Sequence, residues 1–225
     1  MALCPFATHK LIPHGSNDPA ITGRIAILHV AVSLAASLFE FFRDRSGGIE
    51  SHFYITITGK IEQYRDTNFE ADANFLANPF AWSIETAGMG ILPWNRLQKR
   101  AIQRLLLWLH QVEGLSLEHV TAWDGVGIGY HVQFGAPGKW TNVSKSCPGA
   151  ANIKLYNTWL VPWLRSNPTA PDPTAKERRA AARLEKARKA LEVARADVAA
   201  DREELQTSRA RVKRLVGRVD KLSGK

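Results

Sequence analysis

Short apolar runs alternate with segments of helical periodicity along the N-terminal part of the chain. From residue 24 to residue 30 the chain is almost continuously apolar, over a length too short for a helix, which suits a strand buried on both faces. The alternation over 53–57 and the return over 61–64, after Gly59, predict a β-hairpin. A further strand is expected at 82–86. These segments together predict a β-sheet.

Three other segments carry apolar residues at helical spacing. The first follows Ser33, which we interpret as an N-cap, and ends before Gly47. The second covers 96–112 and predicts a long helix packed on the sheet. The third opens at Pro148 and is expected to be kinked or ended by Pro162. Helices that alternate with strands, one of them a hairpin, predict an α/β fold with a mixed central sheet flanked by helices.

The C-terminal part of the chain has a different composition. Residues 167–173 are rich in proline and predict an extended linker between a globular domain at 1–166 and the tail at 174–225. The tail contains an apolar residue every seven positions, which predicts a long helix that forms a coiled coil. The repeating positions are Leu184, Leu191, Val198, Leu205, Val212 and Val219.

The positive charge is concentrated in this tail. The chain has 225 residues and a net charge of +9. Residues 174–225 contain 16 Lys and Arg against 8 Asp and Glu, so the tail carries +8 and the rest of the chain only +1. A nearly neutral domain offers no basic groove, so we expect no specific nucleic-acid partner. The tail is instead expected to self-associate through its heptads or to bind an anionic cell envelope.

Export and membrane signals are not visible in the sequence. The N-terminus lacks the basic and apolar regions of a secretory signal peptide, and no apolar run approaches the length of a transmembrane segment. The two cysteines, Cys4 and Cys147, are too few for a disulfide framework. We therefore expect a protein made in the cytoplasm without a signal peptide.

Two histidines and one cysteine are candidate ligands of a catalytic metal. His29 ends the first apolar strand, His131 follows a Gly-Ile-Gly-Tyr stretch, and Cys147 precedes Pro148. Three protein ligands leave a fourth position open for water, which is typical of hydrolytic zinc sites. Taken singly, His29 is more typical of a core histidine than of a ligand, and Cys147 is more typical of a small buried hydrophobic residue. His52 is an alternative second ligand.

Five separated blocks of the sequence carry a resemblance to a known family. In order along the chain they are Ile27-Leu28-His29-Val30, Ser51-His52-Phe53-Tyr54-Ile55, Trp82-Ser83-Ile84-Glu85, Gly129-Tyr130-His131 and Lys145-Ser146-Cys147-Pro148-Gly149. Over about residues 10–165 the chain resembles the type 2 N-acetylmuramoyl-L-alanine amidases, and most of all the amidase domains of endolysins from phages of actinobacteria. That family shares its fold with the peptidoglycan recognition proteins.

The resemblance implies a reaction and a site. It implies one Zn²⁺, held by His29, His131 and Cys147, and hydrolysis of the amide between N-acetylmuramic acid and L-alanine in bacterial peptidoglycan. Glu85 matches the catalytic glutamate of some members, and Lys145 the lysine that stabilises the developing oxyanion. Ser51 replaces a tyrosine that some phage members use, which favours a mechanism based on glutamate. The implied biological role is that of a phage endolysin acting on the host cell wall.

Several of these residues have simpler interpretations. Glu85 is a solvated edge residue if its strand is not central, and Lys145 is a plain surface lysine if the neighbouring serines are exposed. His52 is expected to face the cleft or to donate a hydrogen bond to the site. Trp140, in a long loop between His131 and Cys147, is a candidate for contact with the glycan or peptide. A non-catalytic peptidoglycan-binding module is the alternative function.

Overall fold

The computed structural model describes residues 3–12, 19–44, 49–135 and 138–169. The predicted coiled coil over 174–225 lies outside these ranges, and so does most of the predicted linker. The division of the chain into domain, linker and tail therefore stays a prediction.

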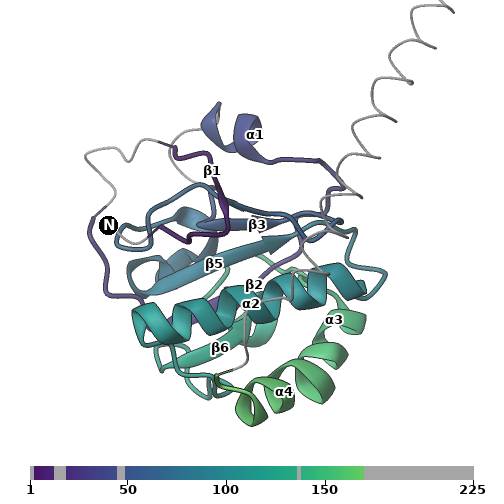
Figure 1. Ribbon diagram of the computed structural model, residues 1–225. Coiled ribbons are helices and arrows are strands. Elements are labelled where there is room, and N and C mark those ends of the chain that lie inside the picture. Colours follow the sequence, from purple (N-terminus) through teal and green to yellow (C-terminus); the bar gives the residue numbers. More distant parts are fainter. Residues whose placement is uncertain (1–2, 13–18, 45–48, 136–137, 170–225) are drawn as a thin grey trace, which may run out of the picture. The chain divides into compact units, whose positions relative to one another are not determined.

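The described residues form a mixed sheet of six strands in the order β1-β4-β3-β5-β2-β6. Its central strands are parallel and its hairpin is antiparallel. The predicted mixed α/β sheet is thus confirmed (Figure 1). The strands are β1 (Thr8–His9), β2 (Ile25–Leu28), β3 (Phe53–Ile55), β4 (Ile61–Gln63), β5 (Ala81–Thr86) and β6 (Gly127–Tyr130).

The strand β2 forms the centre of the site-bearing half of the sheet. All four of its residues are buried, and it pairs in parallel with β5 on one side and with β6 on the other. A strand with neighbours on both edges and cover on both faces requires a continuous apolar run, which is what its sequence provides. The predicted hairpin is also present, since β3 and β4 pair in an antiparallel register. Gly59 lies in its turn with φ of 77°, a conformation that glycine adopts without strain.

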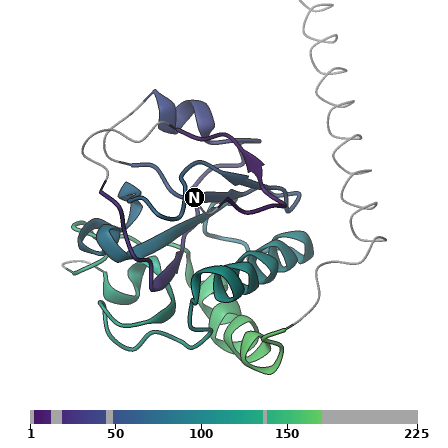
Figure 2. The ribbon, with the colours of Figure 1, turned by 60° about the vertical axis from the view of Figure 1, so that its left-hand side comes forward.

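Helices cover the sheet. The helix α2 (Arg96–Glu113) and the C-terminal helical segment lie together against one face, as Figures 1 and 2 show. Ala26, Leu28 and Ile84 of the sheet pack into this layer. The other helical elements are α1 (Phe39–Arg43), the 3-10 segments η1 (Asp72–Phe80) and η2 (His131–Phe134), and the C-terminal run of α3 (Ala150–Leu155), the π-helical η3 (Tyr156–Leu160) and α4 (Val161–Ser166).

Two predicted helices differ from those observed. The helix expected after Ser33 begins only at Phe39, because Ser33 pairs with Gly88 in an isolated bridge and holds its segment extended. Of the two outcomes expected at Pro162, an end of the helix is wrong, because the helical run continues to Ser166, whereas a kink there stays a prediction. Pro162 lies in the first turn of α4, directly after the π-helical segment, where the loss of its N–H is tolerated.

The length and apolar content needed to cross a membrane are found in no helix of the described residues.

The cap of α2 gives a test of the fold. The side chain of Asn95 accepts hydrogen bonds from the amides of Leu97 and Gln98, and the Gln98 side chain bonds back to the Asn95 amide. We predict that Asn95→Ala lowers the free energy of unfolding by about 1 kcal/mol, because it leaves amides of the first turn unpaired. Urea unfolding measures the change. Asn95→Asp, which keeps an acceptor, should lose clearly less, and equal losses would contradict the capping role.

Candidate metal centre

Strand register brings three of the predicted site residues side by side. Leu28 of β2 is in register with Ile84 of β5 and with Tyr130 of β6. The residues that come next are His29, directly after β2, Glu85, still within β5, and His131, directly after β6 at the start of η2. All three therefore lie level with one another at the carboxyl ends of parallel strands. Because side chains alternate along a strand, these three point to the face opposite the layer packed by Leu28 and Ile84.

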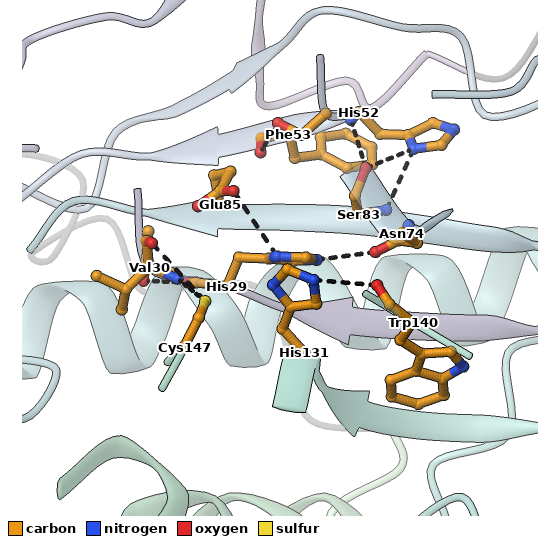
Figure 3. Close-up of polar contacts among 12 residues, drawn as sticks. His29, Val30, His52, Phe53, Asn74, Ser83, Glu85, His131, Trp140 and Cys147 are labelled. Atoms are coloured by element: carbon orange, nitrogen blue, oxygen red, sulfur yellow. Dashed lines mark hydrogen bonds and ion pairs between the residues drawn. The ribbon is translucent and has the colours of Figure 1, made fainter. Parts of the chain in front are cut away.

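Cys147 joins this group from the loop that precedes α3. The ligand atoms of His29, His131 and Cys147 all lie within 4.8 Å of one another. The two imidazole rings are adjacent, with centroids 4.3 Å apart, and the Cys147 side chain points toward them (Figure 3). The backbone amide of Val30 donates a hydrogen bond to Sγ of Cys147 at 3.1 Å, which fixes the sulfur at the end of β2.

Each histidine is anchored through one ring nitrogen. Nε2 of His29 donates to Oδ1 of Asn74 at 2.8 Å, and Nε2 of His131 donates to the carbonyl of Trp140 at 3.0 Å. Both acceptors are oxygens, so the proton of each neutral ring resides on Nε2. Nδ1 of each ring is left with a lone pair, as a metal ligand requires.

Burial keeps the donor atoms uncharged in the absence of a cation. It lowers the pKa of His131 to about 4, with a further contribution from Lys145. Burial and the neighbouring His131 lower the pKa of His29 well below its ordinary value. Burial also raises the pKa of the Cys147 thiol to about 12, and Glu85 adds to the effect. Neutral imidazoles are ready to bind a metal, whereas the thiol becomes a thiolate only when a cation compensates its charge.

Glu85 lies beside His29, on the side of the ring that carries Nδ1. Its Oε1 is 3.7 Å from Nδ1 of His29, and its side chain is 16% exposed. The strand β5 lies between β3 and β2, so the position is central rather than at a sheet edge. Burial raises the pKa of Glu85 to about 8, while the charge of Lys145 lowers it. Oε2 of Glu85 is buried without a hydrogen-bond partner in the described part of the chain, which leaves it available to a bound molecule.

The donor cluster opens into a pocket of about 950 Å³. Glu85 and the three donor residues line it, together with the exposed Lys145. Much of the remaining wall is apolar and solvent-exposed, contributed by Val32, Ile49, Phe75, Met89 and Ile91. The pocket therefore combines ionisable groups at its floor with room for an extended ligand.

Other predicted residues lie elsewhere. His52 is fully buried, donates from Nε2 to the Phe69 carbonyl at 2.9 Å, and is absent from the donor cluster and the pocket lining. Ser51 is also buried, and its hydroxyl donates to the Phe53 carbonyl at 3.0 Å. The Trp140 indole is fully buried and packs against Phe134, although the residue borders the pocket. In this structure its contribution to the centre is the carbonyl that orients His131.

Asn74 is the residue of the site that sequence reasoning missed. It lies in η1, over a stretch of sequence that has neither helical nor strand periodicity. Its pairing with His29 joins positions 45 residues apart, so only the tertiary fold reveals it.

Comparison with known proteins shows the fold. No protein-family model matches the sequence, and a comparison with curated proteins finds no match either. A mutant of PlyL has a TM-score of 0.54 at 13% identity, and the match covers 71% of this chain and 98% of that one. The human PGRP-IBETAC in complex with glycosamyl muramyl pentapeptide has a TM-score of 0.53 at 15% identity, and the match covers 69% of this chain and 97% of that one.

A third neighbour is the N-acetylmuramoyl-L-alanine amidase LysC of Clostridium intestinale. Its TM-score is 0.50 at 16% identity, with 67% of this chain and 95% of that chain covered. The predicted resemblance in fold is thus confirmed: the chain has the fold shared by N-acetylmuramoyl-L-alanine amidases and peptidoglycan recognition proteins. At these sequence identities the similarity shows the fold alone. The activity must be inferred from the residues of the site.

The donor set fits zinc. Two neutral imidazoles and one thiolate are ligands that Zn²⁺ prefers, and the site residues supply three of them from a single locus. Both histidines hold their other ring nitrogen against an oxygen acceptor, as metal-binding histidines almost always do.

Loss of the thiol tests this donor set. We predict that Cys147→Ser reduces bound zinc to well below one ion per chain, because a serine hydroxyl is a far poorer ligand for Zn²⁺ than a thiolate. Atomic emission of the purified protein measures the stoichiometry. Cys4→Ser removes the other cysteine, which is buried outside the donor cluster, and should leave the zinc content unchanged. Full zinc in Cys147→Ser would show that the third ligand is a different residue.

The buried His52 predicts a pH dependence of stability. Burial lowers its pKa from 6.5 to about 4. Between these values the unfolded chain binds a proton that the folded chain does not, so stability falls as the pH decreases. We expect His52→Gln to flatten this fall by up to about 1.4 kcal/mol per pH unit in urea unfolding of the metal-free protein. An unchanged slope would contradict the assignment of a neutral His52.

Proposed function

We propose that the chain is a zinc-dependent amidase that hydrolyses the bond between N-acetylmuramic acid and L-alanine in peptidoglycan. The observation that carries the proposal is the convergence of His29, His131 and Cys147, with Glu85 beside them, on the floor of one pocket. The fold supports it, because N-acetylmuramoyl-L-alanine amidases share that fold. A purely binding role would not need a carboxylate with an unpaired buried oxygen next to a set of metal ligands.

The three donors would hold the ion and leave one position open. When bound, Zn²⁺ polarises a carbonyl oxygen and lowers the pKa of water to about 7. His29 and His131 would bind the ion through Nδ1, because their Nε2–H groups donate to Asn74 and to the carbonyl of Trp140. Val30 supports the Cys147 thiolate by donating its amide proton to the sulfur.

Glu85 moves the protons of the reaction. Its carboxylate accepts a proton from the attacking water and then delivers it to the nitrogen of the departing L-alanine, so that the C–N bond breaks without an amide anion. Its pKa is raised to about 8 by burial, and a cation bound beside it lowers that value. The carboxyl group can therefore exchange a proton in both directions near neutral pH.

Lys145 offsets negative charge in the transition state. It lines the pocket, and its charge acts on His29, Glu85 and Cys147. A cation in this place stabilises the tetrahedral oxyanion that forms when water adds to the amide carbonyl. Lys145 is exposed, so its ammonium can approach a bound substrate.

We also propose the role of a phage endolysin in host lysis. One fold neighbour is the endolysin amidase LysCS of Clostridium intestinale, with a TM-score of 0.50 at 16% identity. The charge of +8 over residues 174–225 would attract the protein to an anionic envelope, and the heptads would allow self-association. Salt separates the two effects, since electrostatic binding weakens with ionic strength and an apolar seam persists.

The product of digestion tests the function. Mass spectrometry of peptidoglycan treated with the full chain should show free lactyl ends and new L-alanine amino termini. Intact muropeptides together with retention on insoluble peptidoglycan would favour the alternative, a non-catalytic binding module. The observation that favours this alternative is that the human fold neighbour was solved in complex with a muramyl pentapeptide.

Substitution of the carboxylate tests the mechanism. We predict that Glu85→Gln lowers turnover of peptidoglycan by at least about 100-fold, because the amide accepts no proton. Fold and zinc content should remain, since Glu85 is outside the donor set. Glu113→Gln, which changes a part-buried carboxylate that bonds Thr67, is the matched control and should keep wild-type turnover. Near-wild-type turnover in Glu85→Gln would remove this residue from the mechanism.

A further inference from the structure

The two histidines of the centre are oriented by different kinds of acceptor. The acceptor for His131 is a backbone carbonyl, that of Trp140, whereas the acceptor for His29 is the side chain of Asn74. A backbone carbonyl is present whatever the residue. The orientation of His29 therefore depends on the identity of residue 74, so a substitution at this position can test how the histidine is oriented.

Asn74 is held in place by its own segment. Its backbone amide donates to Oδ1 of Asn78 at 2.7 Å, and Nδ2 of Asn78 donates to Oδ1 of Asp72 at 3.2 Å. Asp72 and Asn78 line the pocket. A chain of hydrogen bonds thus runs from the pocket wall through Asn74 to His29.

The segment is also tied to the acceptor of the second histidine. The amide of Leu76 donates to the carbonyl of Lys139 at 3.1 Å, and Lys139 directly precedes Trp140. Between Asn74 and Leu76 the backbone of Phe75 has φ of 53° and ψ of −118°, a conformation that is costly for a side chain of this size. Such a turn persists only where the surrounding contacts impose it, which here are the bonds of Asn74 and Leu76.

The amide of Asn74 is only partly satisfied. The residue is fully buried, and its Nδ2 has no hydrogen-bond partner within the described residues. An unpaired buried N–H destabilises the fold, so an apolar residue would be favoured if position 74 only filled space. The oxygen of the same amide, by contrast, makes the bond to His29 (Figure 3).

We propose that Asn74 is a positioning residue that keeps the His29 proton on Nε2 and thereby presents Nδ1 to the metal. This inference rests on the proposed zinc site. Loss of the acceptor lets the ring rotate and lets its proton move to Nδ1, where it blocks coordination. Outer acceptors of this kind change metal affinity by about 10- to 100-fold when they are removed.

The experiment compares zinc affinity across four variants of the full chain. Zinc dissociation constants are measured by competition with a chromophoric chelator, and urea unfolding of the metal-free proteins reports stability. We expect Asn74→Leu and the smaller Asn74→Ala to bind zinc about 10- to 100-fold more weakly than wild type. Asn74→Asp keeps an acceptor oxygen and should remain within a few-fold of wild type.

Gln63→Leu is the matched control. Gln63 is a fully buried amide away from the pocket, bonded to the amide of Cys4 and the carbonyl of Arg65. Its replacement should lower stability and leave zinc affinity unchanged. A purely structural role for Asn74 would give the same pattern as Gln63, whereas a positioning role changes the affinity and is rescued by aspartate.

A spectroscopic readout follows the proton itself. In the metal-free wild type, the long-range ¹⁵N–¹H NMR spectrum should show His29 protonated at Nε2, and Asn74→Leu should shift it toward the Nδ1–H form. Wild-type zinc affinity in Asn74→Leu, or affinity in Asn74→Asp as weak as in Asn74→Leu, would overturn the positioning role alone. Failure of the wild type to bind stoichiometric zinc would instead refute the proposed function, and this inference with it.

Discussion

The parallel register of three neighbouring strands is the constraint on which the site depends. Because β2 pairs in register with β5 and β6, the residues that follow Leu28, Ile84 and Tyr130 lie together at the carboxyl ends of these strands and on one face of the sheet. The opposite face is filled by the helix layer, so this face is where polar groups can gather. A shift of one residue in either pairing would turn a histidine or Glu85 into the apolar core. The chemistry is thus a consequence of how the sheet is packed.

The proposed cation would complete the electrostatics of the site. Two imidazoles that burial keeps neutral, a thiol with a raised pKa and a carboxyl group with a raised pKa share a small volume. Burial disfavours the charged forms of the thiol and the carboxyl group. A divalent ion would offset this by favouring the thiolate and the carboxylate. Lys145 alone does not, because it lies at the exposed rim of the pocket.

Local patterns in the sequence predicted the elements whose residues are buried in a regular way. Examples are the fully buried β2, the hairpin of β3 and β4, and the apolar face of α2. In each of them the pattern of apolar residues along the sequence predicts the observed element. Helix α1 starts late because a bridge between Ser33 and Gly88 overrides the helical spacing, and no local pattern contains that bridge. In the same way His52 has the polarity of a cleft residue, but the Phe69 carbonyl and Ser83 enclose it. The contact between Asn74 and His29, on which its proposed role rests, joins distant parts of the chain and has no local sequence pattern.

The claim that two imidazoles and one thiolate bind a single ion is tested most directly by X-ray absorption at the zinc edge of the purified chain. We predict one zinc per chain, with one sulfur at about 2.3 Å and two imidazole nitrogens at about 2.0 Å in a four-coordinate shell completed by oxygen. A spectrum without a sulfur neighbour, or a protein that retains no zinc after mild dialysis, would contradict it. Either result would leave the fold intact and remove the proposed chemistry.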